Sequence, residues 1–221
     1  MIRCAIFDLD GTLVDSMVYW SIAPFEYAKM KNIEPKEDLA DKFLAMSLPE
    51  SAKYFKDVYN VPDSLEKIMD DINSIMEKYY MENVEIKPNI GVLLEKLYSL
   101  NIKMAIASST DKYLIEEVVK KLHIDKYFDF IITSTMVNES KNKPSIYLKC
   151  IEHFNLLPEE TYVFEDLPYG IISSNSVGFV TVGLYDEPSK HLQKQIKDNA
   201  RFYYKKLDDK AVDFLVDFAK K

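Results

Sequence analysis

The stretch CAIFDLDGTLVDS, residues 4–16, decides how the chain can be interpreted. Its apolar run ends abruptly at Asp8 and Asp10, which Gly11 follows directly. The two-residue period of a strand sends Asp8 and Asp10 in similar directions, and Gly11 permits a sharp turn after them. Two carboxylates about 4 Å apart near a protein surface repel by about 4 kcal/mol, so we expect a cation to lie between them.

Composition limits the possible classes of protein. Of the 221 residues, 48% are hydrophobic and 29% are charged, which is typical of a globular chain of one domain, with or without a substantial insertion. Apolar runs are too short for a membrane span, and the one at the N-terminus is too short for a signal peptide, so we expect a cytoplasmic protein. Two cysteines, Cys4 and Cys150, are too few for a disulfide framework. The net charge of −8 disfavours nucleic acid as a partner.

Short apolar runs alternate with helical patterns along much of the chain. The runs at 4–9, 102–109, 128–134, 161–166 and 179–184 are typical of strands, and the segment at 114–122 has helical spacing. This alternation predicts an α/β fold with a doubly wound parallel sheet. Asp8, Ser108 and Asp166 each close an apolar run, so the carboxyl ends of three strands should bring them to one edge.

Residues 16–87 interrupt the alternation. They contain no convincing strand, and the apolar residues between Leu65 and Tyr79 follow helical spacing. We therefore predict a core domain made of residues 1–15 and 88–221, and an inserted α-helical domain of residues 16–87.

Four short motifs, taken in order, resemble the signatures of the haloacid dehalogenase-like (HAD) superfamily. The first is Asp-x-Asp-Gly-Thr, which Asp8, Asp10, Gly11 and Thr12 match in full. The second is Ser108 at the end of a strand, the third is Lys143 in NKPSIY, and the fourth is the pair Glu165 and Asp166 in VFEDLPYG. The resemblance covers nearly the whole chain and implies a Rossmann-like core whose inserted helices form a cap domain.

The resemblance also implies roles for individual residues. Asp8 would be the nucleophile that forms an aspartyl-phosphate, and Asp10 would be the general acid and base. Ser108 would donate a hydrogen bond to a phosphoryl oxygen, and Ser109 beside it would contact the substrate. Lys143 would neutralise the nucleophile and the transferring group.

The assignment of the lysine leaves an alternative. Relatives often have Lys-Pro-x-Pro-Asp before an aromatic residue, whereas this chain has the shorter KPSIY. We predict Lys143 as the catalytic lysine because Pro144 suits the first turn of a helix. Lys141 is close enough in the sequence to compete for the role.

The same resemblance implies a metal site. Oxygen ligands and a phosphate substrate favour Mg²⁺, held by the Asp8 carboxylate, the Asp10 backbone carbonyl and Asp166, with Glu165 binding directly or through water. Zinc is disfavoured because the three histidines lie outside every motif: His123, His153 and His191.

The start of the inserted domain offers candidate substrate contacts. Ser16, Tyr19 and Trp20 share a helix face, which family analogy turns toward the active site, although the two aromatic rings could equally belong to the core of the cap. β-Phosphoglucomutases usually carry His at the position of Trp20, and they place basic residues in a cap loop. The comparable stretch here, residues 43–51, has no Lys or Arg.

These features predict a Mg²⁺-dependent phosphatase that acts on a small phosphorylated metabolite such as a sugar phosphate. The alternative is a hexose phosphate mutase of the β-phosphoglucomutase type. A third interpretation, a regulatory protein that only accepts phosphate, fits poorly with a general base beside the nucleophile. We expect no membrane or nucleic-acid partner, and a monomer by default.

Overall fold

The computed structural model describes residues 1–44 and 46–221, with Asp41 and Leu44 described by their backbone alone. The chain divides into two compact units, each considered by itself. The larger unit comprises Met1–Asp15 and Glu85–Lys221, and the helical unit comprises Ser16–Val84. The return to the larger unit thus comes three residues before the predicted boundary at residue 88.

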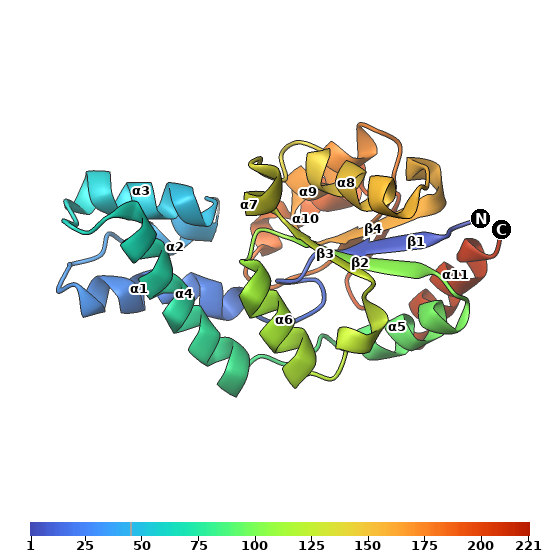
Figure 1. The fold of residues 1–221 in the computed structure, drawn as a ribbon, viewed down its shortest axis with the longest axis horizontal. Helices are drawn as coiled ribbons and strands as arrows, with labels where there is room; N and C mark the ends of the chain where they lie inside the picture. The colour runs from blue at the N-terminus through green and yellow to red at the C-terminus, as the bar shows by residue number, and fades with distance from the viewer. Residues whose placement is uncertain (45) are drawn as a thin grey trace. The chain divides into compact units, whose positions relative to one another are not determined.

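The larger unit contains a six-stranded parallel sheet in the order β3-β2-β1-β4-β5-β6 (Figure 1). Its strands are β1 (Cys4–Phe7), β2 (Lys103–Ser108), β3 (Phe130–Thr133), β4 (Thr161–Glu165), β5 (Val180–Leu184) and β6 (Phe202–Tyr204). The predicted α/β class with a doubly wound parallel sheet is confirmed. The edge strand β6 was not predicted, because three residues are too few to show a period.

Helices cover both faces of this sheet. They are α5 (Ile90–Ser99), α6 (Lys112–Lys121), α7 (Ser134–Val137), α8 (Ser145–Phe154), α9 (Pro168–Asn175), α10 (Gln193–Asn199) and α11 (Asp209–Ala219), with short 3₁₀ turns η1 (Asp125–Tyr127), η2 (Pro158–Glu160) and η3 (Lys190–Leu192). Figure 1 shows α8 and α9 on one face and α5 and α11 on the other. The central strands β1, β2 and β4 are buried on both sides, except at Lys103 where β2 begins, which is why they consist of nearly continuous apolar runs.

The side chains of alternate strand residues pack into the two layers. Ile6, Ala105 and Val163 pack in one core cluster with Tyr147 and Cys150 of α8. On the other face, the hydroxyl of Tyr162 donates a hydrogen bond of 2.9 Å to the carbonyl oxygen of Leu215 in α11. The two-residue period of the strands therefore decides which helix each side chain meets.

The register of the sheet brings the ends of three strands to one level. Phe7 pairs with Ile106 of β2 and with Phe164 of β4. The residues that follow these partners, among them Asp8, Ser108 and Glu165, therefore lie together at the carboxyl edge, where ligands bind in open α/β sheets.

The described residues of the helical unit form four helices: α1 (Met17–Met30), α2 (Leu39–Leu44), α3 (Leu48–Tyr59) and α4 (Leu65–Glu82). The predicted helical stripe lies in α4, where Ile68, Ile72 and Met76 are buried. The side chain of Ser64 caps α4 by accepting a hydrogen bond of 3.2 Å from the backbone N–H of Lys67.

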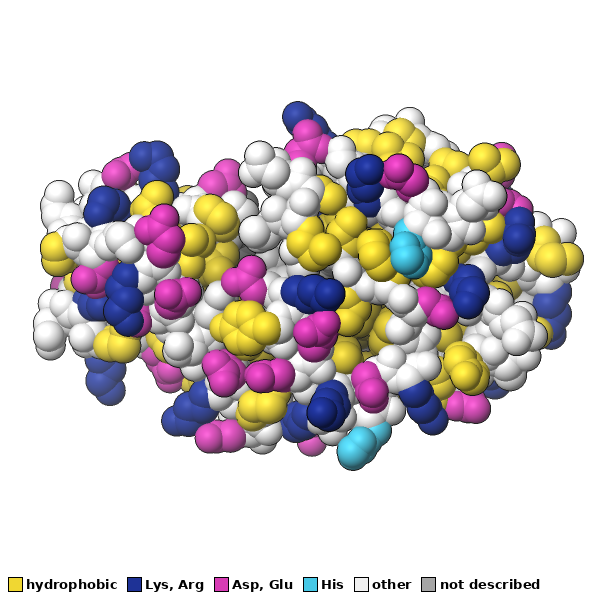
Figure 2. Space-filling model, viewed as in Figure 1, with side chains coloured by type: hydrophobic (Ala, Val, Ile, Leu, Met, Phe, Trp, Pro, Cys, Tyr) yellow, Lys and Arg dark blue, Asp and Glu magenta, His cyan; other side chains and the backbone are white. Residues whose placement is uncertain are grey.

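The visible surface carries both signs of charge. Figure 2 shows basic and acidic side chains interspersed over this face, without a broad basic area of the kind that a nucleic-acid backbone would contact. Among the described residues, no helix has the length and apolar character needed to cross a bilayer.

Candidate active site

A tight turn after β1 presents the two aspartates. Asp8 continues the strand, since its N–H donates to the carbonyl oxygen of Phe164 at 3.0 Å. Gly11 has a φ of 78°, a value that suits glycine, and its N–H donates to the carbonyl of Val14 at 2.9 Å. Asp8 and Asp10 are 7% and 8% exposed, so both acids are held in a nearly closed site.

Lys141 supplies a buried positive charge beside Asp8. Its Nζ lies 2.5 Å from Oδ1 of Asp8 and 2.5 Å from Oε1 of Glu165, and its side chain is 3% exposed. Burial alone would lower the pKa of Lys141, but the charges of Asp8 and Glu165 raise it above its usual value. Lys141 is therefore a permanent cation at this point, and Ser173 Oγ fixes its backbone by donating to its carbonyl at 2.6 Å.

The predicted position of Lys143 beside Asp8 is wrong. Its side chain is 68% exposed, and its Nζ lies 3.0 Å from Oε1 of Glu139. The reason is a turn before α8, closed by a hydrogen bond of 3.1 Å from the N–H of Lys143 to the carbonyl of Ser140. This turn directs Lys141, the alternative in the sequence, toward the acids.

Glu165, which contacts Lys141, has a second hydrogen-bond partner. Its Oε1 also accepts a hydrogen bond of 2.8 Å from the hydroxyl of Tyr147. Gly170 gives both side chains their space, since a Cβ there would lie 2.5 Å from Oε1 of Glu165 and 2.7 Å from the Tyr147 hydroxyl. No sequence motif pointed to Tyr147, because it reaches Glu165 from a helix 18 residues earlier in the chain.

Thr110 connects Asp10 to Ser108. Its hydroxyl donates to Oδ2 of Asp10 at 2.6 Å, and its N–H donates to Oγ of Ser108 at 3.1 Å. Thr110 and Ser108 are both buried. Ser109 is exposed, with its Oγ 3.2 Å from Oγ of Ser134. No sequence motif pointed to Thr110, although it lies only two residues after Ser108.

Three acids lie close enough together to hold a metal ion. Asp8, Glu165 and Asp166 each offer a carboxylate oxygen, and these atoms lie within 4.8 Å of one another. Oδ1 of Asp166 accepts from the Thr12 hydroxyl at 3.3 Å, whereas its buried Oδ2 has no hydrogen-bond partner among the described residues. An unpartnered carboxylate oxygen in an all-oxygen group fits a hard divalent cation.

The electrostatics of the cluster lead to the same conclusion. Burial raises the pKa of Asp8 to about 8, with Lys141 acting against it and Glu165 and Asp10 adding to it. Burial, and then the charges of Asp8 and Glu165, raises the pKa of Asp166 well above its usual value. A bound dication would offset the cost of ionising these acids.

The residues predicted to contact substrate from the cap lie in the helical unit. Ser16 is buried directly before α1, and the Tyr19 ring stacks on Tyr79 at 4.6 Å between centroids. Trp20 Nε1 donates to the Tyr80 hydroxyl at 3.1 Å. The two aromatic rings thus take part in packing this unit, and substrate contact by the three residues stays a prediction. The predicted loop at 43–51 includes residue 45, which lies outside the described residues.

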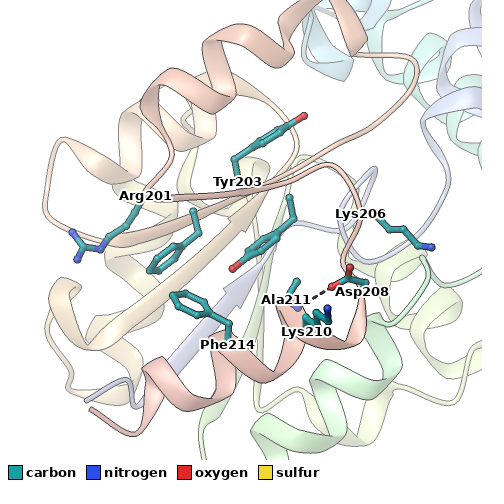
Figure 3. Close-up of a pocket in the computed structure, with 9 residues that line it drawn as sticks. Arg201, Tyr203, Lys206, Asp208, Lys210, Ala211 and Phe214 are labelled. Carbon is teal, nitrogen blue, oxygen red and sulfur yellow. Dashed lines mark hydrogen bonds between the residues drawn. The ribbon is translucent and has the colours of Figure 1, made fainter.

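A groove of about 580 Å³ opens at the far edge of the sheet (Figure 3). It is lined by residues of β6 and of the region up to the first turns of α11: Arg201, Phe202, Tyr203, Tyr204, Lys206, Asp208, Lys210, Ala211 and Phe214. None of the acids around Lys141 lines it, and β4 and β5 separate it from β1. The groove is therefore distinct from the acidic site.

The fold and the site together define a class of enzyme. A parallel α/β sheet whose carboxyl edge bears two buried aspartates, a buried lysine and an acidic cluster is suited to phosphoryl transfer. The family model for haloacid dehalogenase-like hydrolases matches residues 5–184. The chain belongs to this family, in its phosphatase branch.

The named relatives include both phosphatases and a mutase. The chain is 29% identical over 176 residues to a phosphorylated carbohydrates phosphatase of Thermotoga maritima, covering 80% of this chain and 82% of that protein. It is 26% identical over 191 residues to the β-phosphoglucomutase of Bacillus subtilis, covering 82% and 83%. A β-phosphoglucomutase structure from Clostridium difficile, 24% identical, has the same fold, with a TM-score of 0.80 over 99% of this chain and 98% of that one.

Proposed function

We propose that this enzyme is a Mg²⁺-dependent phosphatase of a small phosphorylated metabolite, most simply a sugar phosphate, and that it works through an aspartyl-phosphate on Asp8. The observation that carries the proposal is the contact of Lys141 with Asp8 at 2.5 Å beside the three-acid cluster. An anionic nucleophile can approach an anionic phosphate only where positive charge compensates both.

In the first step, a carboxylate oxygen of Asp8 attacks phosphorus while the bond from phosphorus to the ester oxygen breaks. Asp10 gives its proton to the departing alcohol. Lys141 balances charge on Asp8 and on the transferring group, and the hydroxyl of Ser108 donates a hydrogen bond to a phosphoryl oxygen. The N–H of Thr110, which donates to Ser108 Oγ at 3.1 Å, orients that hydroxyl for its role.

In the second step, Asp10 takes a proton from water, which then attacks the phosphorus and releases phosphate from Asp8. The hydrogen bond of 2.6 Å from Thr110 holds the Asp10 carboxylate for both transfers. Mg²⁺ would be held by Asp8, Asp166 and the Asp10 carbonyl, with Glu165 direct or through water, and would neutralise charge on the phosphoryl group.

Charge in the helical unit supports hydrolysis over mutase activity. A mutase must bind the second phosphate of a bisphosphate, which requires Lys or Arg side chains outside the larger unit. Residues 43–51 contain no Lys or Arg. At the edges of this stretch, Lys42 pairs with Asp38 at 2.7 Å and Lys53 pairs with Asp57 at 2.6 Å. We further propose that residues 16–84 act as the cap and that the enzyme is a cytoplasmic protein. We also propose that it is a monomer, and light scattering would measure its molar mass in solution.

The test measures phosphate release and isomerisation together. β-Glucose 1-phosphate, Mg²⁺ and a trace of glucose 1,6-bisphosphate are added, and a panel of other sugar phosphates is assayed in parallel. We expect phosphate from at least one sugar phosphate to exceed the glucose 6-phosphate formed, and EDTA or Asp8→Asn to abolish it. Rapid formation of glucose 6-phosphate with negligible phosphate would establish the mutase instead. Release that survives EDTA and Asp8→Asn would exclude the mechanism.

A further inference from the structure

A second lysine, partly buried, lies next to the turn that carries the two aspartates. Nζ of Lys87 is 2.7 Å from the carbonyl oxygen of Gly11, 3.0 Å from that of Tyr185 and 2.7 Å from Oδ1 of Asp186. The side chains of Lys87 and Asp186 are 15% and 2% exposed. Three acceptors match the three donors of an ammonium group, so Lys87 is fully engaged in this arrangement.

Lys87 holds the turn at two points. Besides the contact of its Nζ with Gly11, its backbone N–H donates to the carbonyl of Leu13 at 2.9 Å. Gly11 lies between Asp10, which acts as acid and base in the proposed mechanism, and Thr12, which contacts Asp166. A shift of Gly11 would therefore displace groups on both sides of the reacting centre.

Asp186 and Tyr185 fix the other end of this contact. They directly follow β5, whose Gly183 pairs with Glu165 of β4. The ammonium group thus joins the turn after β1 to the segment after β5, two parts of the carboxyl edge that share no strand pairing. This connection spans 99 residues of sequence between Lys87 and Asp186.

The pair is poorly explained by stability alone. Oδ2 of Asp186 is buried without a hydrogen-bond partner among the described residues, so half of this carboxylate is desolvated without compensation. Buried ion pairs often contribute no more stability than apolar side chains of the same volume, because desolvation offsets the attraction. A role in holding a particular geometry accounts for the arrangement better.

We propose that Lys87, oriented by Asp186, is a positioning residue that fixes the turn bearing Asp8 and Asp10 and so sets the rate of the chemical step. The inference rests on the proposed phosphatase function for its kinetic consequence. A displacement of about 1 Å in a reacting group can lower the rate by about 100-fold. We therefore expect loss of Lys87 to lower kcat and to leave KM almost unchanged.

The test compares Lys87→Met with a matched control, Lys96→Met. Lys96 forms an exposed ion pair with Asp213 at 2.5 Å on the same unit, so the control makes the same change of charge at a place remote from the turn. We expect Lys87→Met to lower kcat by about 10- to 100-fold, Lys87→Arg to keep more activity than Lys87→Met, and Lys96→Met to match the wild type. Asp186→Asn, which keeps the volume of the side chain, serves if Lys87→Met does not fold, and we expect it to lower kcat in the same way.

Amide hydrogen exchange gives a second result that is independent of catalysis. The peptide covering residues 9–15 should exchange faster in Lys87→Met than in the wild type or in Lys96→Met. Unchanged kcat in Lys87→Met would overturn the inference, and so would unchanged exchange of this peptide. A wild-type enzyme without Mg²⁺-dependent hydrolysis would refute the proposed function instead, and the exchange comparison would still decide whether Lys87 holds the turn.

Discussion

Replacing Lys141 by methionine removes a buried cation and keeps most of the volume of the side chain. In the wild type this ammonium group lies 2.5 Å from both Asp8 and Glu165. In the variant, the buried side chains of Asp8 and Glu165 lie close together without the positive charge of Lys141 between them. We expect both the stability of the protein and its phosphatase activity to fall.

The structure sets the size of both effects. Loss of one partner from a buried ion pair costs about 3–5 kcal/mol of unfolding free energy, and Lys141 is 3% exposed, so little water can compensate. Removing a positioned group that stabilises developing charge costs about 100- to 1000-fold in kcat. The hydroxyl of Tyr147 still donates to Glu165, so the loss of stability should lie toward the lower end of the range.

Lys143→Met is the matched control, because it makes the same change two residues away on an exposed side chain. Steady-state hydrolysis of a sugar phosphate measures kcat, and thermal unfolding at several concentrations of Mg²⁺ measures stability. We expect Lys143→Met to resemble the wild type in both. Full activity of Lys141→Met, or a collapse of activity in Lys143→Met alone, would refute the reasoning.

Three further predictions address the surroundings of Lys141. Gly170→Ala should destabilise the protein by about 1–3 kcal/mol and lower kcat, because the new Cβ would lie 2.5 Å from the Glu165 side chain. Chemical denaturation measures the loss of stability. The control Gly91→Ala should show no such loss, because its Cβ would lie 3.7 Å from its nearest neighbour. Thr110→Val should lower kcat by about tenfold, because it loses the hydrogen bond to Asp10, whereas Thr110→Ser keeps that hydrogen bond and should keep the wild-type kcat. Equal kcat values for the two variants would contradict a role of Thr110 in holding Asp10. The pKa of Asp8 is raised to about 8 and that of Asp166 is raised as well, so below pH 8 binding of Mg²⁺ must displace protons. We expect the affinity for Mg²⁺ to rise with pH by at least about tenfold per unit over part of that range. Calorimetry in two buffers of different ionisation enthalpy measures the protons released, and binding without proton release would contradict the prediction.

Local patterns in the sequence were enough to predict the fold class and the reactive turn. Apolar runs and helical spacing are local properties, so they indicated the parallel sheet and the helical stripe in α4. Asp8 and Asp10 are adjacent to a strand and to Gly11, and their side-chain directions follow from the geometry of that strand. Strand ends also placed Ser108, Glu165 and Asp166 at the same edge of the sheet.

The choice between Lys141 and Lys143 lay beyond the sequence, since both are flexible side chains in the same short loop. The hydrogen bond between Ser140 and Lys143 that directs Lys141 inward is a property of the folded turn.

The sequence by itself thus determined which residue types meet at the carboxyl edge of the sheet, because strand period and motif spacing act within a few residues. The tertiary structure alone decided how those residues are held. Tyr147 lies 18 residues before its partner Glu165, and Asp186 lies 99 residues after its partner Lys87. Such contacts depend on how helices pack onto the sheet, and no local pattern in the chain specifies that packing.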